Sequence, residues 1–308
     1  MKPTGGSEIT YNKLVSQFTK SELNDFNVIC SNCHFENIQK NKINILWQQL
    51  SYDQTNVQNM TNKDFVNSID CFAFVSHWQF EKFRKYFNVP EERSVILRNA
   101  TTPFKLKTKR NKKKLKLIYT STPWRGLNVL IESIKQLNEI RDDFEIDIYS
   151  STIIYGDGFY NSENKLYEKL FDECRNTKNI NYKGYATNQQ IRKAVSEADI
   201  MAYPNIFEET SCISVIEAMS AGCYMVTTNY GVLPETATGF ATYEPYQPNL
   251  QQLADNYTLT LNECMNNYKK GEYNDLLKVQ QKYFNTYYSW SYRVHEWRKV
   301  FKKLKNEK

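Results

Sequence analysis

Short apolar runs alternate with longer amphipathic segments along most of this 308-residue chain. Each run has the length of a buried strand, and the apolar residues that follow recur every three or four positions, as on one face of a helix. In the second half of the chain these runs occur at 115–119, 146–149, 180–182, 199–204 and 224–228. Four strand–helix repeats within about 110 residues predict a parallel sheet with helices on both faces, which is the doubly wound pattern.

The first hundred residues carry a smaller set of the same elements. Tyr11, Leu14 and Val15 are spaced for the buried face of an opening helix. Strands are predicted at 27–30, 43–47, 71–75 and 95–97. Ser76 then supplies an N-terminal cap for a further helix. A second, reduced α/β domain that is also doubly wound is therefore expected.

A basic segment separates the two halves. Lysine and arginine fill most positions from 105 to 116, and they account for much of the formal net charge of +6. We place a domain at 1–104, a linker at 105–114, a second domain at 115–288 and a final helix at 289–308. The basic linker and the lysine-rich C-terminus are expected to be solvated, with attraction to anionic membrane lipid as the alternative. Because the linker lacks interleaved aromatic residues for base stacking, no nucleic-acid partner is expected.

Composition indicates a globular protein, with 41% hydrophobic and 14% aromatic residues. No apolar run approaches the roughly 18–20 residues that a membrane span needs, and the opening residues do not resemble a signal peptide. We therefore expect a cytoplasmic location. The seven scattered cysteines suit reduced thiols better than disulfides. Cys30 and Cys33 lack a second pair of ligands at zinc spacing, so no metal site is expected.

The segment 209–222 is the most informative part of the chain. Glu209 and Glu217 stand with seven residues between them, across a loop and the start of an apolar helix. Strands at 199–204 and 224–228 flank this segment and place the loop at the carboxyl edge of the predicted sheet, where open α/β sheets bind ligands. The backbone amides of 210–213 would suit a phosphate there, because the start of a helix attracts anions.

This segment resembles the donor-binding signature of the retaining glycosyltransferases of family 4, which have the GT-B fold of two Rossmann-like domains. The matching residues are Glu209, Glu217, Ala218, Met219, Ala221 and Gly222. The resemblance implies that Glu217 holds the ribose hydroxyls of a nucleoside diphosphate sugar and that Glu209 acts catalytically on the donor sugar. It implies a diphosphate held by the amides of Thr210, Ser211, Cys212 and Ile213, and a last helix that crosses back onto the first domain.

Further positions follow from the same resemblance. Arg125 stands where the family usually has a lysine, and its guanidinium is suited to the negative charge that develops on the departing diphosphate. Gly5 and Gly6 match a Gly-Gly loop that approaches the donor phosphate or the acceptor, a close approach that glycine permits. The expected reaction needs no metal or other cofactor, and it transfers sugar to a saccharide or lipid-linked acceptor.

Three departures from the family pattern leave alternatives open. Thr120 replaces a usual arginine of the phosphate site, Gln49 stands near the position of a usual histidine, and only Met1 to Thr4 precede the Gly-Gly loop. His77 is a weaker substitute for that histidine, since it follows a different strand. A degenerate GT-B protein that binds sugar nucleotides without catalysis is the alternative function. A GT-B epimerase ranks last, because no acid or base group stands out in the first domain.

Overall fold

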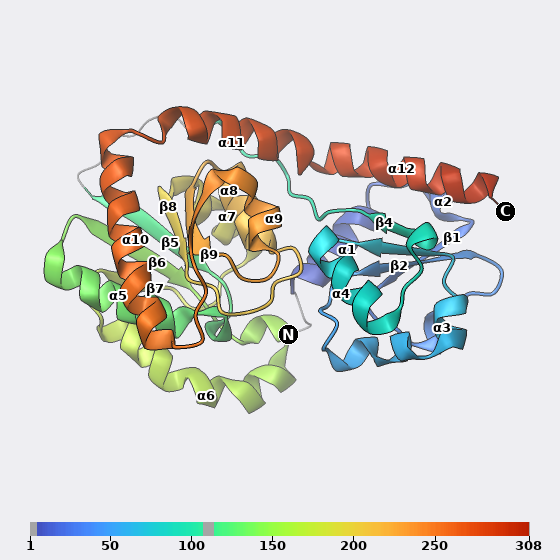
Figure 1. Cartoon of the computed structure of the whole chain (residues 1–308), viewed down its shortest axis with the longest axis horizontal. Coiled ribbons are helices and arrows are strands. Elements are labelled where there is room, and N and C mark those ends of the chain that lie inside the picture. Colours follow the sequence, from blue (N-terminus) through green and yellow to red (C-terminus); the bar gives the residue numbers. More distant parts are fainter. Residues whose placement is uncertain (1–4, 107–113, 308) are drawn as a thin grey trace.

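The computed structural model describes residues 5–106 and 114–307, which form two lobes with a parallel sheet in each (Figure 1). The basic stretch at 107–113 and the residues that precede Gly5 lie outside the described residues. Strands occur within two residues of every predicted position. The prediction of two Rossmann-like domains is confirmed.

The N-terminal sheet has four parallel strands in the order β1-β2-β3-β4. The strands are β1 (Phe26–Cys30), β2 (Ile43–Gln48), β3 (Cys71–Phe74) and β4 (Ser94–Ile96). The helices are α1 (Gly6–Val15), α2 (Lys20–Leu23), α3 (Lys63–Asn67) and α4 (His77–Phe87). Because the strands keep their sequence order, this sheet has no reversal of winding, and the doubly wound pattern predicted for both domains belongs to the other sheet.

The C-terminal sheet has six parallel strands in the order β10-β9-β8-β5-β6-β7. The strands are β5 (Leu115–Thr120), β6 (Phe144–Tyr149), β7 (Ile180–Tyr182), β8 (Ile200–Tyr203), β9 (Tyr224–Thr228) and β10 (Ala241–Glu244). The chain winds outward from β5 in one direction and from β8 in the other. The reversal therefore falls between β5 and β8, and ligands of such sheets bind beyond the carboxyl ends of the strands at that point.

Helices surround this sheet and continue to the C-terminus. They are α5 (Leu127–Ile140), α6 (Asp157–Asn176), α7 (Asn188–Glu197), α8 (Ile213–Ser220), α9 (Leu233–Ala237), α10 (Leu250–Lys270), α11 (Asn274–Tyr287) and α12 (Trp290–Asn306). The sequence pattern led to no prediction for α6, α10 or α11. No helix within the described ranges combines the length and apolar character needed to cross a membrane.

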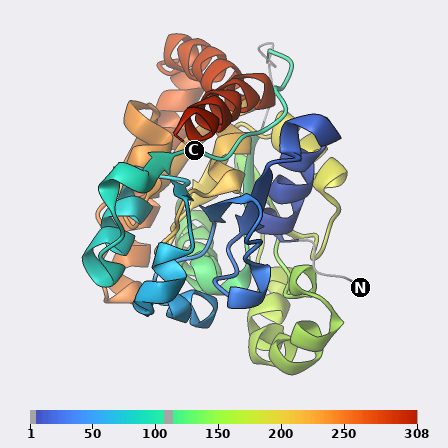
Figure 2. The same ribbon diagram turned by 90° about the vertical axis from the view of Figure 1, so that its right-hand side faces the viewer.

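Alternation along the N-terminal strands builds a separate core on each face of the sheet. Phe72 and Phe74 of β3 pack with Phe83 of α4 on one face. On the other face, Trp47 of β2 meets Trp297 of α12 edge-on, with 5.4 Å between the ring centroids. The last helix of the chain therefore completes the core of the first domain, and both ribbon views show α12 lying across that lobe (Figures 1 and 2).

The chain crosses between the lobes twice, and the two crossings touch. The first crossing follows β4, and the second joins α11 to α12. The amide of Thr101 donates a 2.7 Å hydrogen bond to the carbonyl of Tyr288, and Thr101 forms a β-bridge with Ser289. Any movement of one lobe against the other must therefore act on both crossings together.

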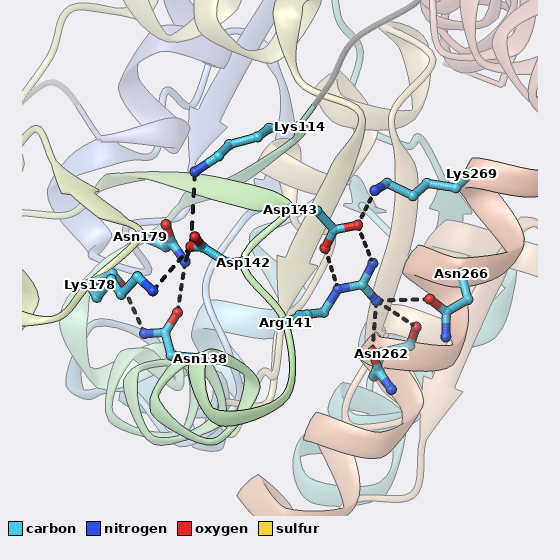
Figure 3. Close-up of polar contacts among 10 residues, drawn as sticks. All are labelled: Lys114, Asn138, Arg141, Asp142, Asp143, Lys178, Asn179, Asn262, Asn266 and Lys269. Atoms are coloured by element: carbon cyan, nitrogen blue, oxygen red, sulfur yellow. Dashed lines mark hydrogen bonds and ion pairs between the residues drawn. The ribbon is translucent and has the colours of Figure 1, made fainter.

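A polar network lies at the amino ends of the strands of the C-terminal sheet (Figure 3). Arg141 follows α5 and places its guanidinium 2.7 Å from Asp143, at the start of β6. The same guanidinium donates to the side chains of Asn262 and Asn266 on α10, at 2.7 and 3.0 Å, and Lys269 also pairs with Asp143. These contacts hold the pKa of Asp143 well below its usual range. They connect α10 to the amino ends of the strands, at the side of the sheet opposite the carboxyl ends.

Candidate active site

A cleft of about 1270 Å³ opens between the lobes, at the carboxyl ends of β5 and β8. Both domains line it. The lining includes every site residue predicted from the sequence, namely Gly5, Gly6, Gln49, Thr120, Arg125, Glu209, Thr210, Ser211, Cys212, Ile213 and Glu217. Residues separated by more than two hundred positions in the chain therefore share one cavity.

Glu209 lies in the loop between β8 and α8 and is almost fully buried. Its Oε1 accepts a 2.6 Å hydrogen bond from the hydroxyl of Tyr203, the last residue of β8. The guanidinium of Arg125 lies 3.0 Å from the same oxygen and 4.8 Å from the ring centroid of Phe207. Arg125 comes from the turn that follows β5, so the reversal between β5 and β8 is what brings the two side chains together. Burial, reinforced by the charge of Glu209, raises the pKa of Tyr203 well above its usual value, so Tyr203 acts as a hydrogen-bond donor.

The start of α8 is an uncapped helix N-terminus that faces the cleft. Its N-cap, Cys212, has a φ of 57° and makes no side-chain capping bond. The first amides of a helix have no partner within the helix and carry its positive dipole end. Gly6 of α1 approaches this end closely, since a Cβ on Gly6 would lie 3.2 Å from Cδ1 of Ile213. The predicted phosphate site therefore has contributions from both domains.

Glu217 projects from the second turn of α8 and is also nearly buried. Its Oε1 pairs with Arg192 of α7 at 2.7 Å and accepts from Thr101 Oγ1 at 3.3 Å. Burial raises the pKa of Glu217, and the guanidinium of Arg192 opposes that shift. The carboxylate predicted to bind ribose hydroxyls is thus already engaged through one oxygen.

The N-terminal domain meets this loop through the segments after β2 and β3. Thr210 Oγ1 donates a 2.9 Å bond to the carbonyl of Gln49, and the carbonyl of Thr210 accepts from Ser76 Oγ at 2.8 Å. The side chain of Gln49 forms a reciprocal amide pair with Asn99, with bonds of 3.0 and 2.9 Å. Gln49 lines the cleft as predicted, but both its amide nitrogen and its amide oxygen are bonded to Asn99.

Several buried hydroxyls in the cleft lack a hydrogen-bond partner among the described residues. They are Ser51 Oγ after β2, Thr120 Oγ1 at the end of β5, Thr122 Oγ1 in the turn that follows, and Ser150 Oγ after β6. A buried hydroxyl without a partner is costly, at about 1–3 kcal/mol. A polar ligand in the cleft would supply the missing partners.

A family comparison identifies the chain. The model of the family described as glycosyl transferases group 1 matches residues 99–272, more than half of the sequence. The chain belongs to this family. No curated protein matches the sequence.

Solved structures share the fold of this glycosyltransferase at low identity. A glycosyltransferase from Rickettsia africae ESF-5 has a TM-score of 0.68 at 16% identity, covering 99% of this chain and 83% of that one. Alr3699/HepE of Anabaena, in complex with UDP and glucose, has a TM-score of 0.68 at 13% identity, covering 98% and 84%. The pneumococcal O-GlcNAc transferase GtfA, in complex with UDP and GlcNAc, has a TM-score of 0.67 at 14% identity, but this chain covers only 60% of it.

Four residues that surround the predicted site were missed by the sequence reasoning. Tyr203, Arg192, Thr101 and Asn99 each contact a predicted site residue. Tyr203 ends a strand at the reversal, a position that signals function in such sheets. The other three carry no local signal, because their partners lie between 25 and 116 residues away in the sequence.

His77, the weaker substitute for the family's histidine, and Cys33 are not among the residues that line the cleft. The amide of His77 donates to Glu235 at 3.0 Å, and the residue is exposed on the first turn of α4. Cys33 is buried and accepts a hydrogen bond from Gln48, and burial raises its pKa to about 12. Among residues 5–106 and 114–307, no three His, Cys, Asp or Glu side chains form a group that could hold a metal ion.

Proposed function

We propose that this chain is a retaining glycosyltransferase of family 4 that moves a sugar from a nucleoside diphosphate sugar to a saccharide or lipid-linked acceptor without a metal ion. The observation that supports this most directly is the Arg125–Glu209 pair at 3.0 Å, in the same cleft as Glu217 and the uncapped start of α8. This set offers one cation, one helix dipole and two carboxylates, which match the charges and hydroxyls of the proposed donor.

In the proposed reaction the bond between the anomeric carbon and the diphosphate oxygen breaks, and its electron pair moves onto the diphosphate. The acceptor hydroxyl oxygen bonds to the anomeric carbon on the same face, and its proton leaves with the diphosphate. Arg125 and the amides of Ser211, Cys212 and Ile213 stabilise that charge. Glu209 Oε1 is engaged by Tyr203 and Arg125, so Glu209 meets the donor sugar through its other oxygen. Glu217 accepts the ribose hydroxyls. The buried hydroxyls of Thr120 and Thr122 bond the diphosphate. They partly compensate for the absence of the arginine that the family usually has at position 120.

A UDP-sugar is the first donor to test, because two of the structures with the same fold were solved with UDP. A thermal-shift screen of UDP-, GDP-, ADP- and TDP-sugars, followed by a sugar-release assay, identifies the donor. The Glu217→Ala variant serves as the control for the site. Proton NMR of the released or transferred sugar then gives the anomeric configuration, and inversion would refute the retaining mechanism. Activity that persists in EDTA supports independence from metal.

The alternative is a degenerate GT-B protein that binds sugar nucleotides, and the Gln49–Asn99 amide pair favours it. Binding of a donor without turnover, with saccharide and lipid acceptors both supplied, would establish this alternative. Co-sedimentation with anionic vesicles tests whether lysine residues of α12 bring the protein to a membrane carrying a lipid-linked acceptor.

A further inference from the structure

One arginine of α7 joins the donor side of the cleft to the first crossing between the lobes. The Nη1 atom of Arg192 donates to Glu217 Oε1 at 2.7 Å and to Thr101 Oγ1 at 2.8 Å. Its Nη2 atom donates to the carbonyl of Thr102 at 2.6 Å. The guanidinium carbon lies 3.8 Å from the ring centroid of Phe104. A single side chain thus contacts Thr101, Thr102 and Phe104 of the crossing as well as one carboxylate of the site.

The crossing that receives Arg192 is itself firmly attached to the C-terminal domain. The backbone of Phe104 exchanges two hydrogen bonds of 3.0 Å with the side chain of Asn285 on α11. The amide of Thr101 is bonded to the carbonyl of Tyr288 at the second crossing. The guanidinium of Arg192 therefore packs against a backbone that is fixed from the opposite side.

The position of Glu217 depends strongly on Arg192. A carboxylate that leaves water loses solvation, and it stays charged only with a partner that compensates. Burial raises the pKa of Glu217, and Arg192 is the largest influence in the opposite direction, with smaller ones from Thr101 and Asn188. Both Arg192 and Thr101 bind Oε1. Their contacts fix the rotation of the carboxylate and direct its hydrogen-bonding capacity at Oε2 to other donors.

We propose that Arg192 is a positioning residue for ribose recognition, which orients the Glu217 carboxylate toward the two ribose hydroxyls and is itself held in place by Phe104. This inference rests on the proposed role of Glu217 in donor binding. A lysine cannot replace Arg192, because an ammonium lacks the planar fork that reaches Glu217, Thr101 and Thr102 together.

Ribose discrimination is the property that tests this proposal. UDP, GDP and ADP are each titrated by calorimetry against their 2′,3′-dideoxy counterparts, and the ratio of the two Kd values is recorded. Hydrogen bonds to a charged group predict a ratio of about tenfold to hundredfold for the wild type with its preferred base. In Arg192→Gln the ratio falls to less than about threefold, because the ribose form binds more weakly while the dideoxy form is unaffected.

Two variants refine the test. Lys193→Gln removes an exposed positive charge from the next position of α7 and leaves the ratio unchanged. Phe104→Leu removes the aromatic face against Arg192 and lowers the ratio by less than Arg192→Gln does. Circular dichroism and thermal melts establish that each variant is folded. Should Arg192→Gln fail to fold, Arg192→Lys and Phe104→Leu carry the same test.

The outcomes separate this inference from the function on which it rests. A wild type without ribose discrimination for any base would overturn the role of Glu217 and the inference together. The sugar-transfer assay would still show whether the chain transfers sugar. A wild-type ratio retained in a folded Arg192→Gln protein would overturn the role of Arg192 alone. Equal weakening of both nucleotide forms would reveal a merely structural contribution and would also overturn the proposal.

Discussion

Arg125 Nη1 lies 3.0 Å from Glu209 Oε1, and each residue follows one of the two strands between which the sheet reverses. Tyr203 donates to the same carboxylate oxygen. The negative charge of Glu209 is thereby balanced by a guanidinium that lines the same cleft as the start of α8. In the proposed function, the donor diphosphate meets a cation that has already lost much of its conformational freedom.

Replacing Glu209 is expected to stop turnover with little effect on folding. Glu209→Gln keeps the size of the side chain but removes the charge that orients Arg125, and we expect kcat for sugar release to fall by about 10²–10³-fold. Glu208→Gln is the matched control, since Glu208 precedes it in the loop and pairs with Lys82 at 3.2 Å. An equal loss in Glu208→Gln would point to the loop conformation and not to the Glu209 carboxylate.

Gly231 controls the backbone that carries Glu209. Its φ is 62°, and an added Cβ would lie 2.8 Å from the amide nitrogen of Glu209. Gly231→Ala must displace that backbone, and we expect a loss of activity of about 10²-fold, typical of a misplacement near 1 Å. Gly239→Ala is the control, because its Cβ would meet nothing within 4 Å. Steady-state kinetics and thermal melts of both variants measure this effect. Equal losses of activity in Gly231→Ala and Gly239→Ala would contradict the prediction.

Glu235 fastens α9 of the C-terminal domain to the N-terminal domain. It accepts from the amides of His77 and Trp78 at 3.0 and 2.9 Å, and it pairs with Arg98 at 2.9 Å. These contacts place a carboxylate at the positive end of α4. We expect Glu235→Ala to weaken the association of the two lobes by about 1–2 kcal/mol. Small-angle X-ray scattering should show a larger radius of gyration, which the exposed-site variant Glu272→Ala should not share. An unchanged radius would show that other interdomain contacts suffice.

Removal of Trp297 is expected to destabilise the first domain although the residue lies near the end of the chain. Its side chain is fully buried against Trp47. Trp297→Ala should lower the free energy of unfolding by about 3–5 kcal/mol, as is usual for a large buried aromatic residue. Urea denaturation measures the change, with exposed Lys299→Ala of the same helix as control. A cost below about 1 kcal/mol would mean that α12 adds little to this core.

Buried thiols should make the protein sensitive to alkali. Burial raises the pKa of Cys30 to about 11 and the pKa values of Cys71 and Cys174 to about 12. Because these folded-state values exceed those of unfolded thiols, the stabilisation is complete below about pH 9 and is lost as the pH rises toward 11–12. Urea unfolding at pH 8, 10 and 11 measures the decline. The stability of Cys71→Ala should decline less steeply with pH, and an identical slope would exclude a contribution from the Cys71 thiol.

Local patterns were enough to predict most of the framework. Strands such as 115–119 and 224–228 are short apolar runs, and their alternation with amphipathic segments reveals a parallel sheet without any knowledge of contacts. The segment from Glu209 to Gly222 is contiguous, so its resemblance to a family signature can be read from the sequence. The helices α6 and α10 were not predicted, although apolar residues at helical spacing, such as Phe171 and Cys174 in α6 and Leu261 and Met265 in α10, form a buried face on each.

The sequence by itself determined the two α/β domains and the positions of Glu209, Glu217 and Arg125, since strand periodicity and contiguous motifs are properties of neighbouring residues. Only the tertiary structure decided how those residues are paired. The bond between Gln49 and Asn99 and the contacts of Arg192 with Glu217 and Thr101 join segments that are distant in the chain. These pairings bring together the segments after β2 and β4 in one domain, and α7, α8 and the first crossing in the other, and no local pattern of residues encodes them.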